Sequence, residues 1–510
     1  MKANDKFTEK ALLFGLLFMA IVPLSVSGQF SVAHRLEYQL GNLPDVEPES
    51  RTSMYNQLNL SYSHQNLTAG VRAEFFKTEP AGRQYSKFQQ KYMYYQGEQF
   101  EIRLGNFYET LGRGLLLRSY EIPGVVYEDL GSRQRYGFYK DVEGVSLRYF
   151  NSFIQAKILY GRPLDLLSPP KFSSQVRRPN LVQGGEVNIQ VLPAFSPGIL
   201  FLRQDMQSRI NEYGGMNASG YFDSGTQYYV EYVQEKGNGN EFLRFGKTNR
   251  HAFYASVSQV FSRVSFSLEL KDYNAFTLNF NDPPSLIREH APTLLNRATH
   301  TVDTRNERGF QLESIVNIGS LNTATFNVSA AENQTFTDDK LFYEFFADLN
   351  LYFSERTQFK PFIDFSQDEV ISVKNRFTTG FSIEQQLFNL WSGYFNLELQ
   401  QFERTYSSAP ELDHGATNAL TGLSVSRAPD LTVGMTVEVS NDPLETNTLL
   451  DFDEYNFAAW PGFFVNYQVN QDHMVQVFYG KRRGGNACSG GICYEVLPFK
   501  GLEVRINSIL

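Results

Sequence analysis

The closing ten residues, Gly501-Leu-Glu-Val-Arg-Ile-Asn-Ser-Ile-Leu510, carry the pattern that decides the fold. Side chains alternate between the two faces of a strand, so each face can be read from every second residue. One face of this strand is apolar and the other is polar: Leu502, Val504, Ile506 and Leu510 against Glu503, Arg505 and Asn507. Such a strand fits a soluble sheet or a membrane barrel, and its recurrence along the chain decides between them.

The same alternation recurs in long runs through the rest of the chain. Clear examples are Val264–Lys271, Tyr343–Phe353, Phe395–Gln400 and Leu431–Ser440. Several runs approach or exceed the roughly 9–11 residues that a tilted strand needs to cross a bilayer. Strands of soluble sheets usually stop at about five or six residues. The runs therefore favour transmembrane strands.

The connections between these runs alternate between very short and long. Short links are expected at His64–Asn66, Gln96–Gln99, Phe150–Ser152, Phe261–Arg263, Gly319–Leu321, Ser354–Thr357, Ala428–Asp430 and Asn470–Asp472. Long ones are expected at Tyr108–Asp141, Gly161–Asn180, Tyr273–Arg308, Thr405–Gly415, Asn441–Trp460 and Arg482–Pro498. Tight turns on one rim and long loops on the other are typical of outer-membrane barrels. We predict an all-β, antiparallel up-and-down barrel of about 22–24 strands. The exact number is open because the segment Gln227–Phe261 fits either two strands or three.

The start of the chain predicts export. Met1–Gly28 has Lys2, Lys6 and Lys10 before the apolar stretch Ala11–Val26, and it ends on a small residue. We expect a cleaved signal peptide over residues 1–28, with an uncleaved membrane anchor as the alternative. Residues 29–510 are then one barrel domain in the outer membrane of a bacterial cell. Strand-like sequence begins near Phe30, so no N-terminal plug domain is expected, and the first strand should pair with the last.

Composition agrees with a barrel and argues against nucleic-acid binding. The chain has 44 Phe and 29 Tyr but only 2 Trp, and aromatic rings form the interface girdles of membrane barrels. Soluble sandwiches and propellers are also rich in aromatic residues. The net charge is -9 with both signs interspersed, and no dominant basic surface is evident. Outer-membrane lipid is the expected partner, small solutes are possible, and protein partners are unknown.

Candidate functional residues lie in the first long loop. Gly105–Glu121 contains Gly112 and Gly114, which permit a sharp turn, and residues 109–178 hold 11 Arg+Lys against 7 Asp+Glu. The candidates for a pore constriction are Glu109, Arg113, Arg118, Glu121, Arg133 and Arg135. One interpretation is a loop folded into the lumen that narrows it and favours anions. The other is a solvated surface loop, although Leu115–Leu117 would need a packing partner.

The two cysteines, Cys488 and Cys493, lie in Gly484-Gly-Asn-Ala-Cys-Ser-Gly-Gly-Ile-Cys493. An exported pair this close is expected to form a structural disulfide that closes a small loop. A metal site would need further thiol or imidazole ligands nearby, and a redox pair usually has two intervening residues. We therefore expect a disulfide and no metal.

Two stretches resemble a known family. The Gly105–Glu121 stretch, and the Cys-x-x-Gly-x-Cys of Cys488–Cys493 followed by Pro498-Phe499 and Gly501, resemble an uncharacterised family of outer-membrane β-barrels found in Bacteroidota. The resemblance implies a barrel over most of residues 29–510. It implies no catalytic or ligand-binding residues, because the family has no established activity.

No motif predicts an enzyme, and no cofactor is expected. None of the seven histidines has metal-ligand spacing with another His or Cys, and no phosphate-binding glycine loop is present. Asp451, Asp453 and Glu454 fit either a Ca²⁺ site or a solvated acidic loop.

Two functions remain open. The first is a porin-like barrel that allows passive passage of small solutes. The alternative is a closed barrel that acts as a surface interaction or secretion-machinery component through its long extracellular loops.

Overall fold

A computed structural model describes residues 28–79, 81–164, 180–206, 209–236, 250–283, 288–303, 305–334, 339–446 and 457–510. Residues 1–27 of the expected signal peptide lie outside the described residues. Asp451, Asp453 and Glu454 do so as well.

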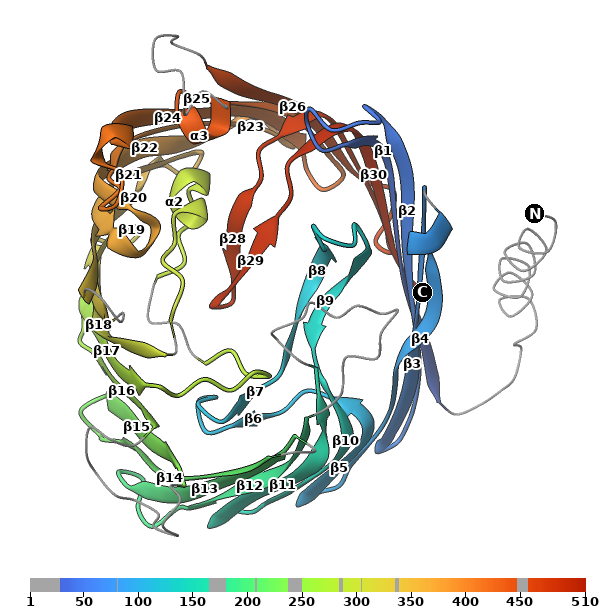
Figure 1. Cartoon of the computed structure of the whole chain (residues 1–510), viewed down its shortest axis with the longest axis vertical. Coiled ribbons are helices and arrows are strands. Elements are labelled where there is room, and N and C mark those ends of the chain that lie inside the picture. Colours follow the sequence, from blue (N-terminus) through green and yellow to red (C-terminus); the bar gives the residue numbers. More distant parts are fainter. Residues whose placement is uncertain are drawn as a thin grey trace, which may run out of the picture.

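Twenty-four strands form one antiparallel sheet that closes on itself (Figure 1). The strands of this ring are β1 (Gln29–Asn42), β2 (Arg51–His64), β3 (Leu67–Thr78), β4 (Tyr85–Gln96), β5 (Phe100–Phe107), β10 (Val142–Phe150), β11 (Ile154–Pro163), β12 (Leu181–Ile189), β13 (Ser196–Asp205), β14 (Ile210–Tyr221), β15 (Thr226–Glu235), β16 (His251–Val260), β17 (Val264–Asn274), β18 (Asn306–Ile318), β19 (Asn322–Gln334), β20 (Asp339–Ser354), β21 (Thr357–Asp368), β22 (Val373–Phe388), β23 (Trp391–Arg404), β24 (His414–Arg427), β25 (Leu431–Ser440), β26 (Ala458–Gln468), β27 (His473–Arg482) and β30 (Phe499–Ile509).

The first and last strands close the ring. β1 pairs with β30 in a continuous register from Ala33 opposite Ile509 to Asn42 opposite Lys500. β30 pairs with β27 on its other side. The predicted barrel and its predicted closing pair are confirmed. The strand number is at the upper end of the expected range, with two strands, β15 and β16, in the region that had been ambiguous.

The alternation of residues sorts the side chains between the outside and the inside of the ring. On β17, Phe266, Leu268 and Leu270 are exposed on the outside, whereas Lys271 is buried on the inside. An apolar exterior and a polar interior are what lipid on one side and water on the other require. A strand shifted by one residue would place its charges in the lipid. The hydrophobic pattern therefore fixes the register.

Tight turns join the strands at one rim. Only residues 65–66 separate β2 from β3, residues 319–321 separate β18 from β19, and residues 428–430 separate β24 from β25. The longer connections lie at the other rim. Short helices occupy several of them: η1 (Ala81–Arg83), η2 (Glu369–Ile371), η3 (Pro410–Leu412) and α3 (Pro443–Thr446). No helix of the described ranges is both long and apolar enough to cross a membrane.

Three of the long connections turn back inside the ring, as Figure 1 shows. Insert 1, residues 108–141, contains β6 (Thr110–Leu111), β7 (Leu117–Arg118), β8 (Tyr120–Glu128) and β9 (Arg135–Lys140). Insert 2, the described residues 275–283, 288–303 and 305, contains α2 (Thr293–Arg297). Insert 3, residues 483–498, contains the hairpin of β28 (Gly485–Ser489) and β29 (Ile492–Val496).

The main apolar core lies between insert 1 and the inner wall. Leu111, Leu115, Leu116 and Leu117 are almost completely buried in one cluster with wall residues of β5 and β10–β17. Full burial of one such side chain contributes about 1.5–3 kcal/mol. The three consecutive leucines thus pack against the barrel, and the solvated-loop interpretation of this segment does not hold.

A second cluster holds the far end of insert 1. Tyr136 and Tyr139 of β9 pack against Tyr55, Phe76 and Tyr85 of β2, β3 and β4. Insert 1 is therefore attached by apolar contacts at two separate places on the wall.

Candidate functional site

Insert 1 begins at an ionic anchor built on Glu109. This side chain is 1% exposed, and its two carboxylate oxygens accept from Arg148 Nε and Nη2 of β10 at 2.8 and 2.7 Å. Lys157 Nζ lies 3.8 Å away and Ser146 Oγ donates at 3.1 Å. Burial raises the pKa of Glu109, but the hydrogen bonds and charge of Arg148, together with Lys157 and Arg103, outweigh it and lower the pKa below its ordinary value. Glu109 is therefore a structural anion.

Insert 1 bends at Gly112, where φ is +57° and a Cβ would lie 2.2 Å from Glu231 Oε2 of β15. The absence of a side chain lets the backbone approach the wall. The Gly112 amide donates to Glu186 Oε2 of β12, and the Arg113 amide donates to Glu231 Oε2 at 2.7 Å. Two wall carboxylates thus hold the bend through its backbone, which leaves the Arg113 side chain available.

The Arg113 guanidinium lies over the ring of Tyr229, 5.1 Å from its centroid. Arg113 is exposed, and among the described residues no carboxylate lies within ion-pair distance of its guanidinium. The cation–π contact contributes about 0.5–1 kcal/mol at an exposed site, and it fixes the position of the charge without neutralising it.

Arg118 also lacks a carboxylate within ion-pair distance in the described part of the chain. Its amide donates to Asn281 Oδ1 of insert 2 at 2.6 Å. Its Nη2 donates to the carbonyl oxygen of Gly490 in insert 3 at 2.7 Å. Arg118 therefore lies where the three inserts meet.

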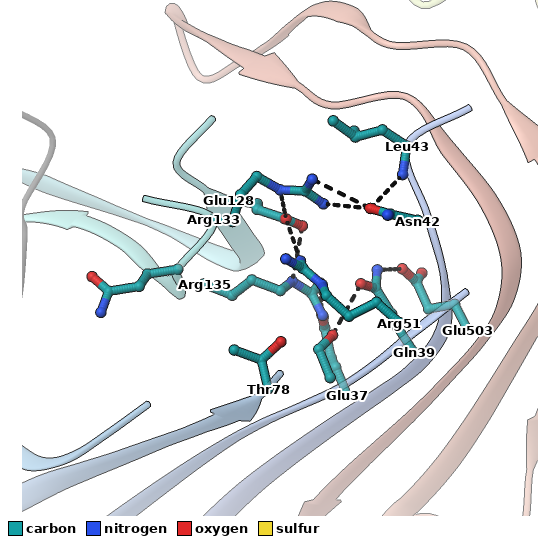
Figure 2. A network of polar contacts seen from close by, with 12 residues as sticks. Glu37, Gln39, Asn42, Leu43, Arg51, Thr78, Glu128, Arg133, Arg135 and Glu503 are labelled. Atoms are coloured by element: carbon teal, nitrogen blue, oxygen red, sulfur yellow. Dashed lines mark hydrogen bonds and ion pairs between the residues drawn. The ribbon is translucent and has the colours of Figure 1, made fainter. Parts of the chain in front are cut away.

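The remaining candidates are paired with the wall or with another residue of insert 1. Glu121 accepts from Arg72 Nη2 and from the Tyr108 hydroxyl, both at 2.8 Å. Arg133 Nε donates to Glu128 Oε1 at 2.7 Å, and the buried Arg135 Nη2 donates to Glu37 Oε2 at 2.5 Å (Figure 2). Arg51 of β2 adds a contact to Glu128 at 3.2 Å.

The six predicted residues thus do not form one cluster. Arg133 and Arg135 lie against β1 and β2 and have carboxylate partners, and the anions Glu109 and Glu121 have arginine partners. Only Arg113 and Arg118 present positive charge that no described carboxylate neutralises. Charge excess in the sequence pointed to the segment that contains these two arginines, but it could not separate arginines with a carboxylate partner from those without one.

Insert 2 is attached by contacts that the sequence did not reveal. Glu398 of β23 accepts from the amides of Thr293 and Leu294 at 3.1 and 2.8 Å, at the start of α2. Arg297 donates to Glu438 of β25. His290 Nε2 lies 3.0 Å from Glu344 Oε2 of β20. A single wall carboxylate facing the lumen has no sequence signature, so these partners could not be predicted.

His300 is a second buried anchor of insert 2. Its Nδ1 lies 2.7 Å from Asp368 Oδ2 and its Nε2 3.4 Å from Glu307 Oε2, and its ring stacks on Phe342. Burial lowers the pKa of His300. The hydrogen bonds to Asp368 and Glu307 and the charges of both carboxylates raise the pKa by more than burial lowers it, so that it is about 9. The imidazole is therefore protonated at neutral pH.

Insert 3 carries the expected disulfide. Cys488 and Cys493 are bonded and face each other across the β28–β29 hairpin. Asn296 of insert 2 donates to the Cys488 carbonyl at 3.1 Å and accepts from the Cys488 amide at 2.9 Å. Arg483 pairs with Glu438 and Glu445 at 2.7 and 2.9 Å. The hairpin therefore joins insert 2 to the wall.

A pocket of about 340 Å³ lies on the inner wall beside the bend of insert 1. Arg113 and Tyr229 line it, together with serine and glutamine side chains: Gln190, Ser196, Ser219, Gln227, Ser256 and Ser258. These residues come from the ends of β12–β16 that adjoin the tight turns. Among the described ranges of the chain, no group of three or more His, Cys, Asp or Glu side chains could hold a metal ion.

Comparison with known proteins adds a family model and a fold likeness. A model described as a family of unknown function (DUF6029) matches residues 9–197, less than half of the chain but including the Gly105–Glu121 stretch. No curated protein matches the sequence. The chain is therefore similar to an uncharacterised family over its N-terminal part.

Among solved structures, the chain is similar to a mutant of the ferric enterobactin receptor PfeA from Pseudomonas aeruginosa. The TM-score is 0.50 at 9% identity, and the match covers 94% of this chain and 80% of that one. A P pilus usher (PapC) translocation pore scores 0.45 at 8% identity, covering 94% and 99% of the two chains. A BenF-like porin from Pseudomonas fluorescens Pf-5 scores 0.40 at 10% identity, covering 70% and 97%. At 9% identity the likeness to the receptor bears on the fold alone, and with the closed ring it identifies a large outer-membrane-type β-barrel.

Proposed function

We propose that the protein is an outer-membrane pore that passes small solutes passively and prefers anions. One observation carries the proposal: of the four arginines in insert 1, Arg113 and Arg118 have no carboxylate within ion-pair distance among the described residues, whereas Arg133 and Arg135 have one. Charged side chains on a narrowed lumen select ions by sign. Insert 1 would act as the constriction, and its attachment to β10, β12 and β15 keeps it in place.

Conductance of the purified full-length protein in planar bilayers tests this function. We expect discrete openings, and we expect the double substitution Arg113→Glu with Arg118→Glu to lower the anion-to-cation permeability ratio. The double substitution Arg263→Glu with Arg356→Glu, on the exposed tight turns between β16 and β17 and between β20 and β21, makes the same charge change outside the lumen and should leave the ratio nearly unchanged. A lumen that is silent at all voltages would refute the pore, and an unchanged ratio would refute the role of the two arginines.

A second function, a closed barrel that acts through its outer loops, is favoured by a different observation. The inserts bind one another as well as the wall: Arg118 contacts Asn281 and Gly490, and Asn296 contacts Cys488. Such an interlocked plug is consistent with a sealed lumen. A stable protein partner that co-purifies from native membranes with a silent barrel would support this reading over the pore.

A further inference from the structure

The pocket beside Arg113 has the composition of a binding site for a polar anion. Among the described residues that line it, Arg113 is the only charged side chain. Its other polar side chains are uncharged and carry hydroxyl or amide groups: Gln190, Ser196, Ser219, Tyr221, Gln227, Tyr228, Tyr229, Ser256 and Ser258. Serine and glutamine side chains offer both donors and acceptors, which suits a ligand that carries several hydroxyl groups.

The Arg113 guanidinium is oriented for a ligand. The guanidinium carbon of Arg113 lies over the Tyr229 ring, 5.1 Å from its centroid, and the N–H groups lie in the plane of the guanidinium. In that plane the N–H groups form a fork that matches the two oxygens of a carboxylate. The cation–π contact also reduces the conformational entropy lost on binding, because the Arg113 side chain is already held in place.

The carboxylates of the same wall are engaged elsewhere. Glu231 accepts from the Arg113 amide and from the Tyr229 hydroxyl. Glu269 of β17 accepts from the Tyr254 hydroxyl at 2.9 Å. Neither is within ion-pair distance of the Arg113 guanidinium. The positive charge in the pocket is therefore available to an external anion.

We propose that this pocket binds a small hydroxylated monocarboxylate, a sugar acid, with its carboxylate on the Arg113 guanidinium and its hydroxyls on the serine and glutamine side chains. A volume of about 340 Å³ is at the lower end of the range for small-molecule sites and holds one such solute. A single cation balances one carboxylate but leaves a phosphate dianion half neutralised. The inference deepens the proposed function by naming the class of solute, and it places the pocket on the periplasmic side, where barrels have their tight turns.

Binding to the purified full-length protein in detergent, measured by isothermal titration calorimetry, tests the inference without requiring conduction. The probes are glucuronate, the neutral sugar glucose, and glucose 6-phosphate. We expect glucuronate to bind at least about tenfold more tightly than glucose, since the free energy of one hydrogen bond to a charged group corresponds to a change in affinity of this size. Glucose 6-phosphate should bind more weakly than glucuronate.

Two variants and a control separate the site from a general charge effect. Arg113→Gln should weaken glucuronate binding by about tenfold or more and leave glucose unchanged. Ser258→Trp should abolish glucuronate binding by filling the pocket while leaving Arg113 in place. Arg356→Gln removes the same charge from an exposed tight turn outside the pocket lining and should have little effect.

Four results would overturn the site: equal affinity for glucuronate and glucose, tighter binding of glucose 6-phosphate, an unaffected Arg113→Gln variant, or an equal loss in Arg356→Gln. Failure of the proposed function is distinguishable. If the barrel binds glucuronate through Arg113 but never conducts, the binding site is supported and the proposed pore is refuted. If it conducts anions without binding glucuronate, the proposed pore is supported and the binding site is refuted.

Discussion

Removing the carboxylate of Glu109 should release the start of insert 1 from the wall. Glu109→Ala deletes two charge-assisted hydrogen bonds to Arg148, at 2.8 and 2.7 Å. Each such bond contributes about 1.5–3 kcal/mol. Arg148 is partly exposed and retains Glu101 at 3.4 Å, so about 2 kcal/mol is a conservative net loss. Since about 1.4 kcal/mol is a factor of ten, local opening should become about 30-fold more frequent.

Hydrogen exchange measured by mass spectrometry on peptides covering residues 110–119 reports this opening, because exchange through local unfolding follows the opening equilibrium. We expect exchange to be about 30-fold faster there and unchanged in β20–β24. Glu101→Ala is the matched control, because it removes another partner of Arg148 from the wall without touching the insert. Unchanged exchange in Glu109→Ala, or an equal increase in Glu101→Ala, would refute the anchor.

Two further predictions concern the other inserts. Because the pKa of His300 is raised to about 9, its contribution to the docking of insert 2 is complete below the ordinary histidine pKa near 6.5 and is lost as the pH rises through about 9. The hydrogen-exchange rate of residues 290–303, corrected for the intrinsic pH dependence, should therefore increase above about pH 7 in the wild type. In the His300→Gln variant the corrected rate should not change with pH. A wild-type rate that is also independent of pH would contradict this prediction. Substituting both Cys488 and Cys493 by Ser removes the disulfide that closes a small loop, and the chain entropy of that loop is worth about 2 kcal/mol. Hydrogen exchange in β28–β29 should therefore rise by up to about 30-fold, whereas exchange in the β1–β30 pair should not change. If protection of β28–β29 persists, the contacts of Asn296 are sufficient to hold the hairpin.

The barrel could be predicted because its signals are local. Alternation in runs such as Val264–Lys271 reports which side of a strand meets lipid, and link lengths report the two rims. The closing pair of β1 and β30 was predicted from the export signal, the strand lengths and the asymmetry between short turns and long loops. Even the disulfide between Cys488 and Cys493 depends on residues five apart. None of these inferences needed a contact between distant residues.

The position of insert 1 was only half predictable. Leu115–Leu117 indicated that the loop needed an apolar partner, but two interpretations remained open. The partner turned out to be the inner wall, with residues such as Val233 and Leu202. These residues look like ordinary barrel positions in the sequence, so nothing marked them as a docking surface.

By itself, the sequence determined the strand number to within two, the alternation of faces and the segment that carries unbalanced positive charge. Only the tertiary structure decided which arginines have no carboxylate partner among the described residues. Arg135 meets Glu37 across 98 positions, and the Arg113 amide meets Glu231 across 118. Any lumen-facing carboxylate could have been the partner of any of these groups. Electrostatic pairing depends on distance in space, and the closure of the ring sets those distances.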